Sequence, residues 1–191
     1  MQPVPHVPPF DRPATYDDLV KLPDNLVAEI VNGEQHASPR PAPPHAIAGS
    51  RLGAIILFPY DRGRGGPGGW WILGEPELHL GPDVLVPDIA GWRRTRMPSV
   101  PATAYFPLAP DWVCEIISPS TAMLDRARKV GIYAREQVGH AWLIDPIART
   151  LEVLRLEAGR WVISSTHAGD VTVRAEPFAE IEIALADLWV D

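Results

Sequence analysis

Residues 110–121 read PDWVCEIISPST, and this stretch decides how the fold is interpreted. The apolar run at 111–117 predicts a strand, although Glu115 lies within it. The polar residues SPST predict the start of a helix over about 121–138. The next apolar run, HAWLID at 140–145, predicts a second strand. A strand, a helix and another strand in this order indicate a mixed α/β domain.

The rest of the chain adds further helices and strands on both sides of this stretch. Upstream, the sequence predicts a hairpin at 26–38 that turns at Asn32-Gly33. Helices are expected at 14–22 and 45–58, short strands within 70–80 and 83–92, strands at 150–156 and 160–165, and a short helix at 185–189. The segments 61–69 and 93–110 are expected to be loops. This order predicts one sheet flanked by helices.

The composition fits a single folded domain. The chain has 191 residues, of which 46% are hydrophobic and 21% are charged, enough for one sizeable core. The 22 prolines cluster at 3–13, 39–44 and 98–110. Residues 1–13 are therefore expected to form a Pro-rich flexible arm, and residues 14–191 a single domain.

Charge and cysteine content exclude some classes of protein. The net charge of −7 argues against a protein that coats nucleic acid, although a local basic groove remains compatible with it. A single cysteine, Cys114, excludes an intramolecular disulfide and a Cys-based zinc cluster. The N-terminus has neither the basic nor the apolar region of a signal peptide, and no apolar run approaches a membrane span. We expect a soluble cytoplasmic protein.

Two acids stand next to or within apolar strands. Asp88 follows LVP and precedes IAGW, and Glu115 lies inside WVCEII. An acid is costly to bury unless it is paired or bound to a metal. Two such acids on neighbouring strands could converge on one Mg²⁺ ion, which needs only one or two carboxylates.

The following helix supplies a cation for these acids. Because side chains alternate along a strand, Glu115 shares its face with Val113 and Ile117, which carry no charge. Lys129 lies on one helical face with Asp125 and Tyr133, at intervals of four residues. Lysine is uncommon here, since the chain has 15 arginines and only 2 lysines. Lys129 is expected to reach the carboxylates if the helix packs over the end of the strand.

The order Asp88, Glu115, Lys129 resembles the PD-(D/E)xK nuclease superfamily. The surrounding sequence resembles the Uma-two restriction endonuclease family over about residues 15–190, and the resemblance is most specific over residues 110–146. The segments that carry the resemblance are AEIVNGE, PRPAPPH, VPDIAGWR, PDWVCEIISPST and DRARKVGIYAREQVGHAWLIDP.

The resemblance implies an α/β restriction-endonuclease-like core, with a mixed sheet and helices on both faces. It implies a Mg²⁺ or Mn²⁺ centre in which Asp88 and Glu115 are metal ligands and Lys129 is the catalytic lysine. The superfamily lysine expected two residues after the glutamate is Ile117 here, so the lysine has moved to the helix. Glu29 is a further candidate ligand. DNA is the implied substrate, and by analogy within the fold the nuclease is expected to pair as a homodimer.

For several other residues the sequence leaves both a functional and a structural interpretation open. Arg93, Arg94 and Arg96 could contact phosphate or form a solvated loop. Lys129 could pair with Asp125 on a solvated helix face, and Glu29 could be an exposed hairpin residue. Residues that the sequence assigns mainly to packing or local structure are Tyr133, His45, Trp70 and Trp71.

Three functions remain open at this stage. The first is a metal-dependent endonuclease acting on DNA. The second is a nuclease-fold module without catalysis that binds nucleic acid or a protein partner. The net negative charge of the chain and the displaced lysine favour this second function. The third is a metal hydrolase acting on another phosphoester. Fold alone does not decide among them.

Overall fold

The computed structural model describes residues 12–23, 25–119 and 121–190. Residues 1–11 of the expected Pro-rich arm lie outside the described residues. No helix in the described ranges is long and apolar enough to cross a membrane.

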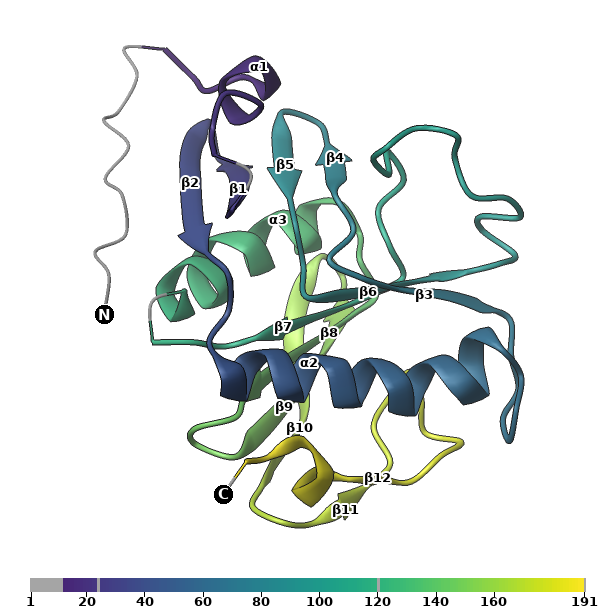
Figure 1. Cartoon of the computed structure of the whole chain (residues 1–191). Helices are drawn as coiled ribbons and strands as arrows, with labels where there is room; N and C mark the ends of the chain where they lie inside the picture. The colour runs from purple at the N-terminus through teal and green to yellow at the C-terminus, as the bar shows by residue number, and fades with distance from the viewer. Residues whose placement is uncertain (1–11, 24, 120, 191) are drawn as a thin grey trace.

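The elements follow the predicted order, with additions (Figure 1). The helical elements are α1 (Tyr16–Leu19), α2 (Pro43–Ile56), the π-helical segments η1 (Leu57–Asp61) and η2 (Leu124–Lys129), α3 (Val130–Arg135) and the 3₁₀ segment η3 (Leu185–Leu188). The first strands are β1 (Leu26–Val31), β2 (Glu34–Pro39), β3 (Trp70–Gly74), β4 (Leu78–Leu80), β5 (Asp83–Leu85) and β6 (Ile89–Arg93). The later strands are β7 (Trp112–Ile116), β8 (His140–Asp145), β9 (Thr150–Glu157), β10 (Arg160–Ala168), β11 (Thr172–Val173) and β12 (Ile183–Ala184).

The main sheet has six strands in the order β10-β9-β8-β7-β6-β3. The β7–β8 pair is parallel and the other pairs are antiparallel, so the sheet is mixed as predicted. The connection from β7 to β8 runs through η2 and α3, as expected for a parallel pair, which needs a long crossover.

The expectation of one sheet is wrong in one respect. The N-terminal hairpin does not join the main sheet but forms a separate four-stranded sheet in the order β2-β1-β5-β4. The hairpin turns at Asn32 (φ 54°) and Gly33 (φ 80°), as the Asn-Gly pair predicts. Ile30 of β1 pairs with Val84 of β5, a contact between distant parts of the chain that local pattern cannot reveal. The short β11–β12 ribbon was likewise not predicted.

Apolar clusters cover both faces of the main sheet, which confirms the predicted layers. On one face α2 packs through Leu52 and Ile56 against strand residues such as Trp112. On the other face α3 packs through Ile132 and Tyr133. In Figure 1 α2 crosses in front of the strands, and β11 and β12 lie on the side of α2 away from β1 and β5. The candidate site lies at the edge where β6 begins and β7 ends.

Candidate active site

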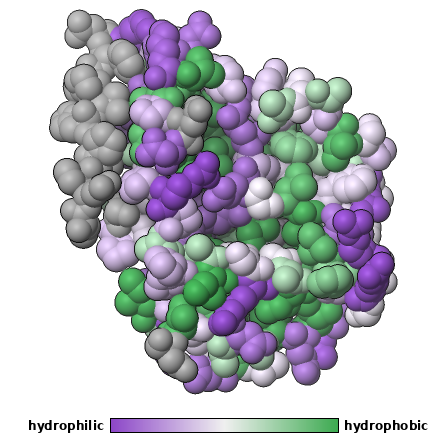
Figure 2. Space-filling model, in the orientation of Figure 1, coloured by the Kyte–Doolittle hydropathy of each residue, from purple (hydrophilic) through white to green (hydrophobic). Residues whose placement is uncertain are grey.

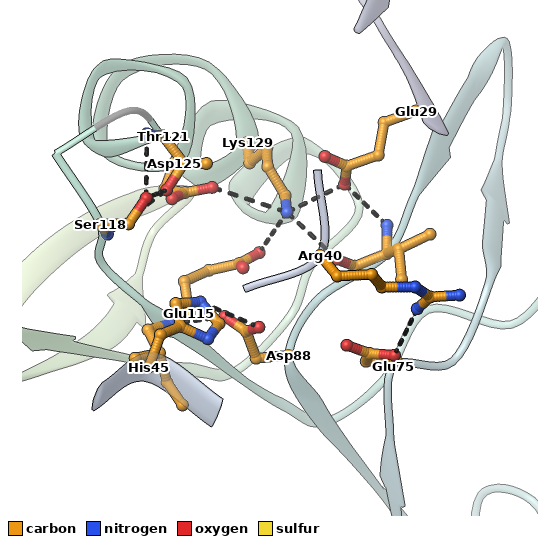
Figure 3. Close-up of polar contacts among 12 residues, drawn as sticks. Glu29, Arg40, His45, Glu75, Asp88, Glu115, Ser118, Thr121, Asp125 and Lys129 are labelled. Carbon is orange, nitrogen blue, oxygen red and sulfur yellow. Dashed lines mark hydrogen bonds and ion pairs between the residues drawn. The ribbon is translucent and has the colours of Figure 1, made fainter. Parts of the chain in front are cut away.

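Asp88 and Glu115 lie side by side because their strands are neighbours. The antiparallel register pairs Ile89 of β6 with Cys114 of β7, and one further step places Asp88 opposite Glu115. The Asp88 Oδ2 atom accepts a hydrogen bond from the backbone N–H of Ile116 at 2.7 Å. This bond ties the start of β6 to the end of β7 and fixes the Asp88 carboxylate beside Glu115 (Figure 3).

Lys129 lies at the centre of the carboxylates. Its Nζ atom is 2.9 Å from Glu29 Oε1, 2.9 Å from Glu115 Oε1 and 3.6 Å from Asp125 Oδ1. Figure 3 shows the ammonium group pointing between these three acids. The residue is only 2% exposed, so the solvated-face interpretation is wrong. The helix that follows β7 therefore brings the lysine to Glu115, as the spacing predicted.

Glu29 reaches the site from the second sheet. It is 7% exposed, which excludes the exposed-hairpin interpretation. Its Oε1 atom accepts a hydrogen bond from the Val86 backbone N–H at 2.7 Å as well as the contact from Lys129. The Val86 carbonyl in turn accepts from Lys129 Nζ at 3.3 Å. Glu29 thus fixes the lysine and the segment just before Asp88.

Tyr133 takes part in the site, which the sequence interpretation missed. Its hydroxyl donates to Glu115 Oε1 at 2.5 Å, and the side chain is fully buried. The only sequence signal was its spacing from Asp125 and Lys129 on one helical face. An aromatic residue on such a face is usually core, and the ring does pack in the core while its hydroxyl holds Glu115.

Burial and neighbouring charges shift the pKa values of the acids and of the lysine at the site. Burial raises the pKa of Glu115 well above its usual value, although the charge of Lys129 opposes this. Burial also raises the pKa of Asp125. Burial alone would lower the pKa of Lys129, but the charges of Glu115 and Glu29 outweigh it and raise that pKa well above the usual value. The lysine is therefore protonated, and a single ammonium group stands among several acids.

His45, in the first turn of α2, is the neighbour of Asp88 on the other side. Its Nε2 atom is 3.3 Å from Asp88 Oδ1. Burial alone would lower the pKa of the imidazole, but the hydrogen bond and charge of Asp88 outweigh it and raise the pKa. The sequence assigned His45 a structural role at the helix start, and the structure adds the contact with Asp88.

A divalent cation fits the donor atoms present. Among the described residues no three His, Cys, Asp or Glu side chains form a ready metal site, and Lys129 Nζ lies between Glu29 and Glu115. Mg²⁺ needs only one or two carboxylates, since waters and substrate phosphates complete its shell. A carboxylate has about four lone-pair sites, so the hydrogen bonds to Asp88 and Glu115 leave room for a cation. A cation beside Glu115 would also stabilise its ionised form, which burial disfavours.

A groove gives access to Asp88 from outside. It has a volume of about 420 Å³ and lies between α2 and β3, with Asp88, His45 and Glu75 at one end. Small residues of α2, including Gly49 and Gly53, line its floor. Figure 2 shows apolar surface near the middle of this face, where β3 lies above α2. Asp88 is thus the part of the site that a substrate can approach.

The structure does not bring the arginines at 93–96 to this site. Arg93 ends β6, and Asp88 precedes the start of the same strand. Five residues of extended strand span about 16 Å. The nearness of these arginines to Asp88 in sequence therefore does not become nearness in space.

These arginines also have partners within the protein. Arg94 pairs with Asp61 at 3.2 Å and lies over the Trp71 ring at 3.9 Å. Arg96 pairs with Asp111 at 3.0 Å. These contacts support the packing interpretation of Trp71 and tie the loop after β6 to its surroundings.

Comparisons with known proteins identify the family and the fold of the chain. The sequence matches the Uma2 family, described as "Putative restriction endonuclease", over residues 13–186. The fold is similar to a crystal structure from Anabaena variabilis described as "a putative nuclease belonging to DUF820". That likeness has a TM-score of 0.74 and 25% sequence identity, and it covers 93% of this chain and 98% of the other. The comparison with curated proteins gave no match. The chain therefore has a nuclease fold and belongs to the Uma2 family.

Proposed function

We propose that this chain is an endonuclease that hydrolyses DNA phosphodiester bonds with Mg²⁺ or Mn²⁺. The observation that carries the proposal is the pairing of Asp88 with Glu115 across β6 and β7, with Lys129 Nζ 2.9 Å from Glu115. The family match supports a nuclease, and the groove that ends at Asp88 supports a substrate approaching from that side.

Asp88 and Glu115 would hold the metal. When bound, a divalent ion supplies Lewis-acid polarisation of the scissile phosphate and a lowered pKa for water. The protein holds the two ligands ready for it. Asp88 is fixed by the Ile116 N–H and by His45, and Glu115 by the Tyr133 hydroxyl.

Lys129 is the third functional group of the proposal. As a protonated ammonium group beside Glu115, it is suited to stabilise the negative charge that develops on the phosphate. Glu29 positions Lys129 rather than reaching Asp88 directly, so we assign it a positioning role and not that of a first metal ligand.

A cleavage assay tests this proposal. Plasmid DNA and labelled oligonucleotides would be incubated with wild type, Asp88→Asn and Glu115→Gln, with Mg²⁺, with Mn²⁺ or with EDTA. Each variant is expected to lose about a hundredfold in rate or more, as when a group that stabilises the transition state is removed. The matched control is Asp170→Asn, an exposed acid paired with Arg149, which should cleave like wild type.

The outcome also separates the alternatives. Cleavage that persists in EDTA or in both variants contradicts the proposal. A nuclease-fold binding module is the second candidate, because Lys129 already neutralises part of the carboxylate charge. That function predicts metal-independent binding of a nucleic acid or protein partner without cleavage. Hydrolysis of a small phosphoester with intact DNA would indicate the third function.

A further inference from the structure

An exposed ion pair lies at the opening of the candidate active site. Arg40, just after β2, and Glu75, just after β3, are joined by a 3.3 Å contact between Arg40 Nη1 and Glu75 Oε2. In Figure 3 this pair lies to the right of Asp88, and both Glu75 and Asp88 line the groove between α2 and β3. The side chains are 59% and 46% exposed, in contrast to the buried acids around Lys129.

The backbone of Glu75 is hydrogen-bonded to the backbone of Asp88. Its N–H donates to the Asp88 carbonyl at 3.0 Å. Its φ of 47° lies in the left-handed region, which a residue other than glycine adopts at a cost and which is found often at functional sites. This backbone places the Glu75 side chain toward Arg40 next to Asp88.

Two cavities meet at Glu75. One is the groove between α2 and β3 that also contains Asp88. The other has a volume of about 360 Å³ and is lined by Arg40, Glu77 and Val86 among others. A chain that passes through both cavities would cross the Arg40–Glu75 pair while its middle lies at Asp88.

We propose that Arg40 is a phosphate-binding residue that leaves Glu75 for a backbone phosphate of the nucleic-acid substrate. The inference rests on the proposed nuclease function. An exposed ion pair contributes little free energy, so it exchanges readily. A guanidinium group can donate two parallel hydrogen bonds to a phosphate, and the exchange replaces one anion with another. Glu75 thereby competes with the substrate for Arg40.

Substitutions of Arg40 and of Glu75 should change DNA affinity in opposite directions. Arg40→Ala removes the phosphate contact, so DNA affinity should fall about tenfold. The slope of log affinity against log salt concentration should become shallower by about one. Glu75→Gln removes the competing anion, so affinity should rise about twofold to fivefold. If the pair only held the loops together, both changes would weaken binding.

The experiment is fluorescence anisotropy of a labelled DNA duplex in EDTA over a series of NaCl concentrations. The matched controls are Arg174→Ala and Glu182→Gln, which break another exposed pair with the same 3.3 Å distance. That pair follows β11, on the far side of α2 (Figure 1). Both controls should bind like wild type. Thermal melting verifies that all four variants fold.

Three results decide the matter. Weaker binding with a shallower salt slope for Arg40→Ala, and tighter binding for Glu75→Gln, support the inference. Wild-type affinity and slope in Arg40→Ala overturn it and leave the nuclease proposal in place, as does weaker binding in Glu75→Gln. A wild-type protein that binds no DNA in EDTA at any salt concentration overturns the inference, because Arg40 then gains no phosphate, and the cleavage assay with metal decides the nuclease proposal separately.

Discussion

Lys129 is the residue on which the site depends. A buried cation is stable only when its partners are close, and Glu29 and Glu115 each lie 2.9 Å from its Nζ atom. Removing one partner of a buried pair leaves an uncompensated charge, which is costly. The contacts that hold Lys129 at the candidate site therefore also stabilise the packing of η2 against β7 and β1.

Lys129→Met is expected to lower the free energy of unfolding by about 3–5 kcal/mol at neutral pH. Equilibrium urea denaturation measures this. The chain offers its own control, since its other lysine, Lys21, is exposed and pairs with Asp18 at the surface. Lys21→Met should change stability by less than about 0.5 kcal/mol. Equal effects of the two substitutions would show that Lys129 is not the centre of a buried charge cluster.

The loss in Lys129→Met should also depend on pH. Burial raises the pKa of Glu115 in the folded state. A carboxyl group with a raised folded-state pKa takes up its proton more readily when folded, so its stability contribution is full below the unfolded pKa of about 4.3 and is lost as pH rises through the folded value. In the variant the charge of Lys129 no longer opposes this rise, so the pKa of Glu115 is raised further and the stability deficit of the variant should shrink as pH falls from 8 toward 5. A deficit that grows on acidification would contradict this sign.

At this scale the sequence predicted the acids and the lysine but not their partners. The face argument placed Lys129 with Glu115 correctly because both are local properties of one strand and one helix. The contact of Arg40 with Glu75 joins positions 35 residues apart, and neither residue stands in an unusual sequence context. Such pairs emerge only when loops from different sheets meet.

Among the elements, the helix after β7 shows how far local pattern reaches. The predicted helix over 121–138 is present, but its part from Leu124 to Lys129 is π-helical and α3 ends at Arg135. The Val130 N–H bonds the Asp125 carbonyl, five residues back. The spacing of apolar residues does not reveal this wider turn, because tertiary packing lets a helix accommodate a π-helical turn without a distinct sequence pattern. π-Helical turns are frequent at functional sites, and this one carries Asp125 and Lys129.

The C-terminal segment has a larger role than its short elements suggest. Phe178, between β11 and β12, is fully buried and contacts the rings of Tyr60, Trp70, Trp112 and Trp142. These rings come from η1 and three strands of the main sheet, so the segment closes the core over that face. The sequence predicted only a short helix at 185–189, because a single phenylalanine in a loop gives no periodic signal.

Phe178→Ala is expected to lower the free energy of unfolding by about 3–5 kcal/mol, since it leaves a cavity among the aromatic rings. The control is Phe58→Ala, because Phe58 is 51% exposed and should change stability by less than about 0.5 kcal/mol. Chemical denaturation of both variants makes the comparison. Similar losses at the two positions would mean that the C-terminal segment is not part of the core.

For the whole molecule, the sequence predicted the fold class but not the division of the strands. The mixed sheet and its two covered faces follow from apolar strands that alternate with helices. The second sheet depends on the long-range pairing of β1 with β5, which brings Glu29 to Lys129. The second sheet thus supplies part of the site, and its strands β1, β2, β4 and β5 are not a separate unit.

The net charge of −7 bears on how such a molecule could act on a polyanion. Glu29, Glu115 and Asp125 surround Lys129, and Asp88 lies next to Glu115, so an approaching phosphate meets more carboxyl groups than cations there. A bound divalent cation would reverse the local sign, and Arg40 would add a positive charge at the opening. The proposed function therefore depends on metal at Asp88 and Glu115.

The most direct test is a calorimetric titration of Mn²⁺ into wild type, Asp88→Asn and Glu115→Gln, with and without a DNA oligonucleotide, with melting followed in parallel. We predict that wild type binds the metal and gains about 2.7 kcal/mol of stability at a hundred times its dissociation constant. Both variants should lose the binding while remaining folded. Equal binding by the three proteins, or no binding by wild type even with DNA present, would contradict a metal centre at Asp88 and Glu115.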